Sequence, residues 1–152
     1  MEAVVLCGVQ GSGKTTLYRE RFLATHVRVS LDLLRSRERE AAFLRLCLDT
    51  RQPFVVDNTN PTAADRRRYV EPARAAGFRT IGYLVEVDAA EAFARNAARA
   101  GAARIPSGSV ATTARAFQRP TLEEGFDELW HATAAAGGGW RVEPLLTTPP
   151  LF

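Results

Sequence analysis

The chain has 152 residues, of which 46% are hydrophobic and 24% are charged, a balance that predicts one globular domain over residues 1–152. No apolar stretch approaches the roughly 20 residues of a membrane-spanning helix, and no basic-then-apolar leader precedes the first strand, so we expect a cytoplasmic protein without a membrane partner. The net charge of +3 permits an anionic partner but does not require one.

Strand and helix patterns alternate along most of the chain. Apolar runs predict strands at 3–7, 27–30, 53–57 and 78–87, and the stretches between and after them predict helices at 14–24, 31–49, 62–77 and 88–101. Thr62 with Asp65 three residues later predicts a capping box at the start of one helix, and Gly77 predicts its end. Strands separated by helices of this length indicate an α/β fold, with a parallel sheet of four or so strands sandwiched between helices.

The last third of the chain has a weaker pattern. A short helix is expected at 110–117 and a turn at 119–126. The segments at 126–133 and 139–145, which flank a run of alanine and glycine, are predicted to form a hairpin, so that a C-terminal hairpin and tail occupy about 126–152. The sequence contains no internal repeat and no sign of a second domain.

A glycine-rich turn follows the first predicted strand and ends in Lys-Thr-Thr at the start of a helix. It fits G-x-x-x-x-G-K-[ST], a turn whose backbone N–H groups, together with the helix dipole, hold nucleotide phosphates. Lys14 is the only lysine in the chain, and its compact ammonium suits a narrow pocket between phosphates. The predicted cofactors are ATP, or another NTP, and Mg²⁺, with the Thr15 hydroxyl as a direct metal ligand. The expected phosphate-binding residues of the turn are Gly8, Gln10, Gly11, Ser12, Gly13, Lys14, Thr15 and Thr16.

Two acidic residues follow the second and third predicted strands. Ligands of open parallel sheets bind beyond the carboxyl ends of the strands, so Asp32 and Asp57 are expected to share a rim with Lys14. Asp57 is placed to bind Mg²⁺ through its water shell or to brace nearby basic groups. Asp32 is placed in the first turn of a helix capped by Ser30, where it can orient an acceptor hydroxyl and accept its proton late in phosphoryl transfer. The alternative for Asp32 is a capping role alone.

Arginines near these positions are candidates for binding phosphate. Arg35 lies three residues after Asp32 on the same predicted helix face and is placed to hold a phosphate of the acceptor. Arg95 and Arg99 lie four residues apart on the predicted helix at 88–101 and therefore face the same way. This segment is similar in position to the lid of small P-loop kinases, and the resemblance implies a lid at about 95–110 that closes these arginines onto the transferring phosphate. The alternatives are a surface pair of Arg35 with Asp32, and solvated arginines on the later helix.

With these residues identified, the chain resembles the polynucleotide 5′-hydroxyl kinases, in particular the kinase half of bifunctional end-healing enzymes that also contain a 3′-phosphatase. The resemblance extends from residue 4 to about residue 129 and rests on GVQGSGKTT, VSLDLLR, DNTNP, RRRYV, ARAAG, RNAAR, IP and RPTLEEGF. It implies a P-loop NTPase fold of the kinase type with a lid. It also implies ATP-dependent transfer of the γ-phosphate to 5′-hydroxyl ends of DNA or RNA.

The resemblance also assigns roles to single residues. Asp32 corresponds to the general base toward the 5′-hydroxyl, and Arg35 to the residue that holds the adjacent 3′-phosphate of the acceptor. Arg99 corresponds to the lid arginine on the donor phosphates, Arg95 is a weaker match, and Asp57 has a supporting role. No D-x-D-G-[TV] stretch is present, so any 3′-phosphate chemistry or sealing is expected to belong to a separate phosphatase or ligase.

Two other functions use the same phosphate-binding turn. A P-loop kinase of a small metabolite or antibiotic shares the turn and the base after the second strand, but not the DNTNP and PTLEEGF elements. A nucleotide-gated binding module needs no base at position 32.

The arginine run at 66–68 is interpreted as the solvent-facing side of a helix, with contact to a nucleic-acid backbone as the alternative.

Overall fold

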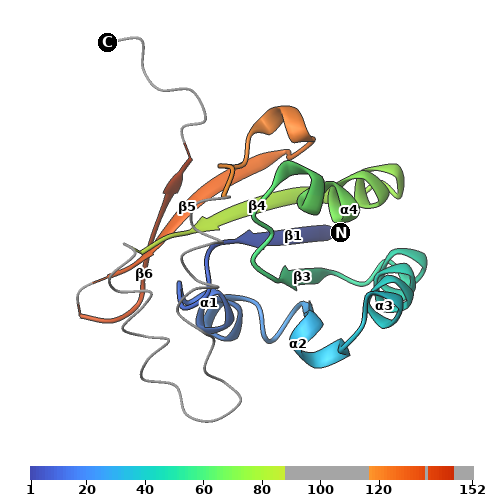
Figure 1. Ribbon diagram of the computed structural model, residues 1–152, viewed down its shortest axis with the longest axis horizontal. Helices are drawn as coiled ribbons and strands as arrows, with labels where there is room; N and C mark the ends of the chain where they lie inside the picture. The colour runs from blue at the N-terminus through green and yellow to red at the C-terminus, as the bar shows by residue number, and fades with distance from the viewer. Residues whose placement is uncertain (88–116, 136, 146–152) are drawn as a thin grey trace.

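A computed structural model describes residues 1–87, 117–135 and 137–145. Its centre is one sheet with the strand order β2-β3-β1-β4-β5-β6 (Figure 1). Neighbouring strands pair in parallel, except β5 and β6, which form an antiparallel hairpin. The predicted α/β class is confirmed, and the sheet is wider than expected because the predicted hairpin joins its edge. The strands are β1 (Glu2–Cys7), β2 (Val27–Val29), β3 (Phe54–Asp57), β4 (Arg79–Val85), β5 (Glu128–Ala134) and β6 (Trp140–Pro144).

Helices lie on both sides of this sheet (Figure 1). Residues of the first helix belong to the apolar cluster on one face, and residues of the third and fourth belong to the cluster on the other. None of the helices in the described ranges has the length and apolar character to cross a membrane. The helices are α1 (Lys14–Arg21), α2 (Leu31–Leu34), α3 (Arg37–Thr50), α4 (Ala63–Ala75) and the short 3₁₀ helix η2 (Leu122–Glu124).

The core occupies both faces of the sheet because the central strands are apolar at nearly every position. Along β1, Val4 and Leu6 belong to the cluster on the α1 side, whereas Val5 and Cys7 belong to the cluster beside α3 and α4. All four side chains are at most 1% exposed. Burial on both faces is typical of parallel sheets, and it fixes the carboxyl end of β1 as a rigid support for the turn that follows.

The chain after β2 forms two helices, so the prediction of one helix over 31–49 is wrong. Arg35 has a left-handed backbone, with φ of 74°, and Ser36 begins a new helix by accepting a hydrogen bond from the Arg39 N–H at 3.2 Å. Serine is a favoured N-cap, and the apolar spacing that runs through this region hides that local signal. Arg35 therefore does not share a helix face with Asp32.

Ser30 does not cap α2 in the way the sequence predicts. It occupies the N-cap position, but its side chain accepts no capping hydrogen bond, and its buried hydroxyl has no hydrogen-bond partner among the described residues. The Leu31 N–H donates instead to Oδ1 of Asn58, at 3.0 Å. A residue from the loop after β3 thus caps the helix that carries Asp32.

The predicted ends of α4 are confirmed, whereas the interpretation of Arg66 as a solvent-facing residue is wrong. Thr62 and Asp65 form the capping box, and Gly77 follows the helix with φ of 79°.

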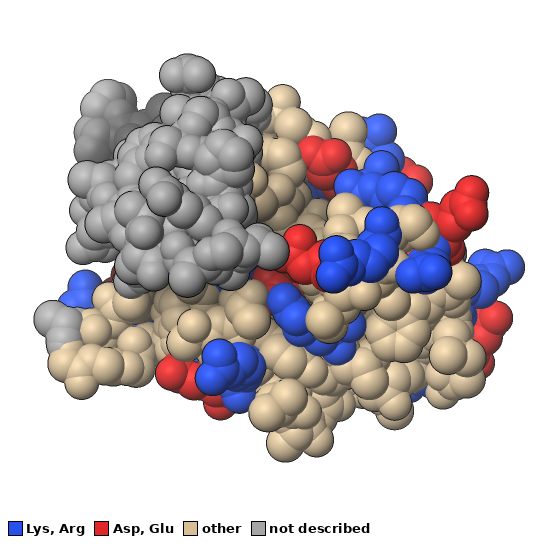
Figure 2. Space-filling model, turned by 60° about the horizontal axis from the view of Figure 1, so that its bottom comes forward, with Lys and Arg blue, Asp and Glu red and all other residues tan. Residues whose placement is uncertain are grey.

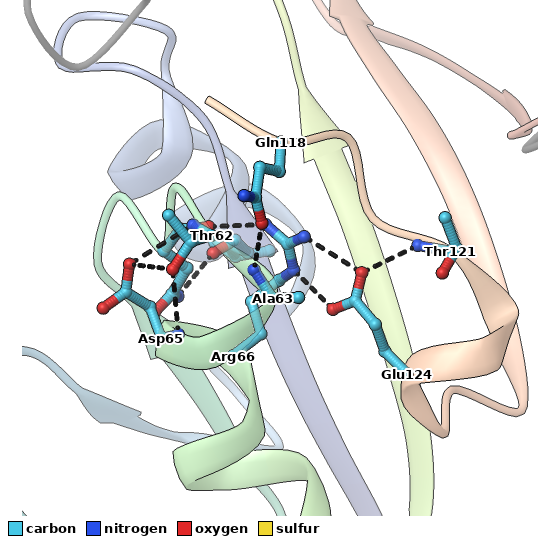
Figure 3. A network of polar contacts seen from close by, with 9 residues as sticks. Thr62, Ala63, Asp65, Arg66, Gln118, Thr121 and Glu124 are labelled. Atoms are coloured by element: carbon cyan, nitrogen blue, oxygen red, sulfur yellow. Dashed lines mark hydrogen bonds and ion pairs between the residues drawn. The ribbon is translucent and has the colours of Figure 1, made fainter. Parts of the chain in front are cut away.

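The Arg66 side chain is fully buried, and its Nε and Nη2 donate to Glu124 of η2 at 2.7 and 3.0 Å (Figure 3). Its Nη1 donates to the Asn60 carbonyl at 2.8 Å. This pair anchors η2 to the start of α4 and to the loop after β3.

Candidate functional site

The glycine-rich turn between β1 and α1 requires glycine for two physical reasons. Gly11 and Gly13 have φ of 82° and 100°, in the left-handed region that other residues rarely adopt. A Cβ at Gly8 would lie 2.5 Å from the carbonyl oxygen of Val85, so no side chain fits there. The Gly8 N–H also donates to the Thr59 carbonyl at 3.0 Å. The turn is therefore held tightly between β4 and the loop after β3.

The Lys14 ammonium is held inside this turn. Its Nζ donates to the carbonyl oxygens of Gly8 and Val9 at 2.9 and 3.0 Å, and the residue is only 9% exposed. Gln10 Oε1 and Ser12 Oγ are buried without hydrogen-bond partners among the residues that the structure describes. Buried polar atoms normally have partners, so these two oxygens make the turn suited to a polar ligand.

Thr15 belongs to a cluster of polar contacts at the carboxyl end of β3. Its hydroxyl donates to Oδ2 of Asp57 at 2.8 Å. Arg28 of β2 donates from Nε to the same carboxylate oxygen at 2.7 Å and from Nη2 to the Thr15 hydroxyl at 3.3 Å. The Asp57 side chain is 3% exposed and the Arg28 side chain 19%, so the carboxylate is paired where little water screens it.

Sequence reasoning missed Arg28. The parallel pairing of β2 with β3 brings it to Asp57, and this pairing is not visible in the sequence. The available signal was the pattern Val27-Arg28-Val29, in which one charged residue stands between the two valines of a short strand and therefore needs a partner.

Asp32 and the phosphate-binding turn line one cavity of about 270 Å³. The shared rim predicted for Asp32, Asp57 and Lys14 is therefore confirmed. Arg35 is exposed and is not among the described residues around this cavity. The cavity is lined by residues of the turn, of α2 and of the loop after β3: Gln10, Gly11, Lys14, Thr15, Leu31, Asp32, Asp57, Asn58 and Thr59.

The other predicted site residues are distributed differently. Thr16 lines a second cavity, of about 330 Å³, which lies between α1 and the β5–β6 hairpin and is also lined by Trp140. Arg95, Arg99 and the predicted lid at 95–110 lie outside the described residues. The phosphate-binding turn therefore has a cavity on the Asp32 side and another on the hairpin side.

The oxygen atoms at this rim fit Mg²⁺ bound together with nucleotide phosphates. Mg²⁺ usually keeps several waters and takes one or two protein oxygens in addition to phosphates. The Thr15 hydroxyl and the Asp57 carboxylate supply such oxygens. In the described ranges, no group of three or more His, Cys, Asp or Glu side chains could hold a metal alone. Thr15 would hold the ion directly and Asp57 through water.

Exposed arginines are frequent on α3, the first half of α4 and the residue that ends α2. On the face drawn in Figure 2, basic side chains form several patches with smaller acidic patches between them. Arg37, Arg45 and Arg68 line a cavity of about 380 Å³ between α3 and α4. The exposed arginines in this region are Arg35, Arg37, Arg39, Arg45, Arg67 and Arg68. Three of these arginines are paired with carboxylates: Arg37 with Glu40, Arg45 with Asp49 and Arg67 with Glu71.

The sequence is similar to known families over most of its length. The family described as "AAA domain" matches residues 35–120. The bifunctional polynucleotide phosphatase/kinase of Schizosaccharomyces pombe is 30% identical over 131 residues, which are 82% of this chain and 32% of that protein. The chain thus spans about a third of the length of this relative.

Solved structures share the fold at low sequence identity. Kti12 of Chaetomium thermophilum in complex with ADP-AlF3 superposes with a TM-score of 0.66 at 16% identity, covering 86% of this chain and 88% of that one. A gluconokinase of Sinorhizobium meliloti gives 0.60 at 17% identity, covering 87% and 82%. The APS kinase CysC of Mycobacterium tuberculosis in complex with AMPPNP and APS gives 0.52 at 20% identity, covering 79% and 83%. The fold is that of P-loop kinases.

Proposed function

The chain belongs to the AAA domain family, and from this premise we propose that it is an ATP- and Mg²⁺-dependent polynucleotide 5′-hydroxyl kinase. The observation that carries the proposal is the cavity shared by Lys14, Thr15 and Asp32. A phosphate-binding turn alone supports nucleotide binding, but a carboxylate across the same cavity supplies what a phosphoryl acceptor needs.

In the proposed reaction, the residues of this cavity act by positioning and by electrostatics. Bound at the turn, Mg²⁺-ATP supplies the phosphoryl group. Lys14 neutralises charge on the donor phosphates, and Thr15 at the start of α1 and Asp57 at the end of β3 would hold the metal. Asp32 accepts a hydrogen bond from the 5′-hydroxyl and aligns it for in-line attack. As the new oxygen–phosphorus bond forms, Asp32 takes the hydroxyl proton, and the bond between the γ-phosphorus and the bridging oxygen breaks to release ADP. Arg99 is proposed to close onto the donor phosphates as part of the lid.

Two observations favour a nucleic-acid acceptor over a small metabolite. The relative from S. pombe, whose name includes a polynucleotide kinase, matches 82% of this chain. In addition, the arginines after Asp32 continue along α3 and α4 rather than ending at the cavity. A small acceptor needs only the cavity, whereas a strand with several phosphates gains from each further cation. Arg35 is proposed to hold the phosphate next to the reacting hydroxyl.

A phosphoryl-transfer assay tests the proposal. The protein is incubated with γ-labelled ATP and Mg²⁺, together with matched DNA and RNA oligonucleotides that end in a 5′-hydroxyl. Label should move to the oligonucleotides, and oligonucleotide binding should weaken steeply as salt rises. Transfer only to gluconate, adenosine phosphosulfate or another small acceptor would support a metabolite kinase, and ATP binding without any transfer would support a nucleotide-gated binding module.

Variants of two carboxylates separate catalysis from general charge effects. Asp32→Ala should abolish transfer while a fluorescent ATP analogue still binds, because the phosphate-binding turn is unchanged. Asp49→Ala is the matched control, since Asp49 is also exposed but lies near the end of α3 in a weak pair with Arg45. Transfer that survives in Asp32→Ala would remove Asp32 as the base.

A further inference from the structure

The helix that carries Asp32 is a single turn, Leu31–Leu34. One turn of helix is marginal in water by itself, so its position depends on contacts with the rest of the fold. Leu34 packs against the buried core, whereas Leu33 is 60% exposed. At its N-terminus, the Leu31 N–H donates to Oδ1 of Asn58. A tertiary hydrogen bond therefore fixes the end of α2 on which Asp32 lies.

The amide of Asn58 is held in one orientation. Its Nδ2 donates to Oε2 of Glu40 at 2.9 Å and to the Tyr69 hydroxyl at 3.1 Å. If the amide were turned over, its oxygen would face the Glu40 carboxylate, and its NH₂ group would face the Leu31 N–H. Both contacts would then pair like with like. The network therefore points Oδ1 at α2.

Two groups behind Asn58, Glu40 and Tyr69, are themselves buried and hydrogen-bonded. Glu40 and Tyr69 are each 1% exposed. The Tyr69 hydroxyl donates to Oε1 of Glu40 at 2.8 Å and accepts from Arg37 at 3.0 Å. Burial, and next the hydrogen bond to Glu40, raise the pKa of Tyr69, so its hydroxyl keeps the proton that it donates. Arg37 also pairs with Glu40 at 2.9 Å.

We propose that Asn58 is a positioning residue for Asp32, and that it transmits the rigidity of the buried Glu40–Tyr69 pair to the helix that carries the base. This inference rests on the proposed role of Asp32. It also explains why the end of β3 is polar at two successive positions. Asp57 contacts the Thr15 hydroxyl on one side, while Asn58 holds α2 on the other. The end of β3 therefore positions both the phosphate-binding turn and the helix that carries Asp32.

An exchange of partners tests this proposal by rescue. Asn58→Asp keeps the acceptor for the Leu31 N–H but places a second carboxylate oxygen against Glu40, so kcat for transfer should fall about 10- to 100-fold through misplacement of the base. KM for ATP should change much less than kcat, because the phosphate-binding turn itself is not altered, although Asn58 lines the same cavity. Glu40→Gln alone should also lower kcat. Combined, E40Q and N58D restore a donor facing an acceptor, and kcat should return to near the wild-type value.

Amide hydrogen exchange tests the same contact without any substrate. In Asn58→Leu, the Leu31 amide should exchange at least about tenfold faster than in the wild type, because it loses its acceptor. Gln118→Leu is the matched control: Gln118 also caps a helix with an amide oxygen, accepting from the Ala63 N–H at 3.0 Å, but that helix is α4. Its loss should leave both Leu31 exchange and kcat unchanged.

The outcomes separate this inference from the proposed function. The inference is overturned if N58D lowers ATP affinity as much as kcat, if the E40Q and N58D combination is no better than the worse single variant, or if Leu31 exchange is unchanged in Asn58→Leu. If the wild-type protein transfers no phosphate to 5′-hydroxyl ends, the proposed function fails, while the exchange measurement still decides whether Asn58 holds α2.

Discussion

The buried pair of Arg66 and Glu124 makes a quantitative prediction about stability. Replacing Arg66 with methionine keeps much of the side-chain volume but removes three hydrogen bonds, two to Glu124 and one to the Asn60 carbonyl. The Arg66 side chain is fully buried, so water does not replace the lost donors. The substitution leaves a carboxylate without its cation in the interface between η2 and α4.

The structure sets the size of the effect. Breaking a buried ion pair by removing one partner costs about 3–5 kcal/mol. Glu124 is 13% exposed and also accepts from the Thr121 N–H at 2.9 Å, so its carboxylate stays partly satisfied and the lower end, about 3 kcal/mol, applies. At about 2–4 °C per kcal/mol for a domain of this size, Arg66→Met should lower Tm by about 6–12 °C.

Urea unfolding followed by circular dichroism measures this change, with the m-value as a check on two-state behaviour. Arg67→Met is the control, because the Arg67 side chain is 62% exposed and its Nε forms a long, solvent-exposed pair with Glu71 at 3.7 Å. Such a pair contributes at most about 0.5 kcal/mol to the free energy of unfolding. Adding Glu124→Leu to Arg66→Met removes the unpaired charge and should recover part of the loss. A loss below about 1 kcal/mol in Arg66→Met, or a double variant less stable than the single one, would refute the reasoning.

Three further predictions follow from other contacts. Arg28→Met removes the guanidinium that bonds Asp57 and competes with Mg²⁺ for its carboxylate. The Mg²⁺ concentration for half-maximal binding of a fluorescent ATP analogue should therefore fall. A rise would mean that Arg28 serves mainly to orient the carboxylate. Gly8→Ala places a methyl group 2.5 Å from a backbone carbonyl oxygen of β4. It should therefore weaken binding of the same analogue and lower the free energy of unfolding by about 1–3 kcal/mol in urea titrations. Unchanged affinity for the analogue would contradict the tight packing of the turn. Burial raises the pKa of Cys7 from 9.0 to about 12 and that of Cys47 from 9.0 to about 11, so neither thiol should react with a thiol reagent at pH 8 until the protein unfolds. Thiols of the unfolded chain lose their protons at lower pH than the buried thiols of the folded protein, so the free energy of unfolding should fall as pH rises above about 9. Reaction of the folded protein with the thiol reagent at pH 8 would show that the thiols are accessible.

The sequence by itself determined the features whose physics is local. Glycines with positive φ, a lysine and a threonine at fixed spacing make a phosphate-binding turn wherever a strand meets a helix, and the structure has this turn between β1 and α1. Continuous apolar runs predicted buried parallel strands, and Thr62 with Asp65 predicted a cap that forms as expected. The rule that parallel strands present their carboxyl ends at one edge was enough to bring Asp32, Asp57 and Lys14 together.

Only the tertiary structure decided which distant groups become partners. Arg66 looks like any helix arginine in the sequence, and Glu124 lies 58 residues away. Strand order places Arg28 beside Asp57, and it is Asn58 rather than Ser30 that caps the helix of Asp32. A buried charge or amide must find a partner within about 3 Å, but chain spacing does not say which one. That choice is made by the packing of strands and helices that are far apart in the chain.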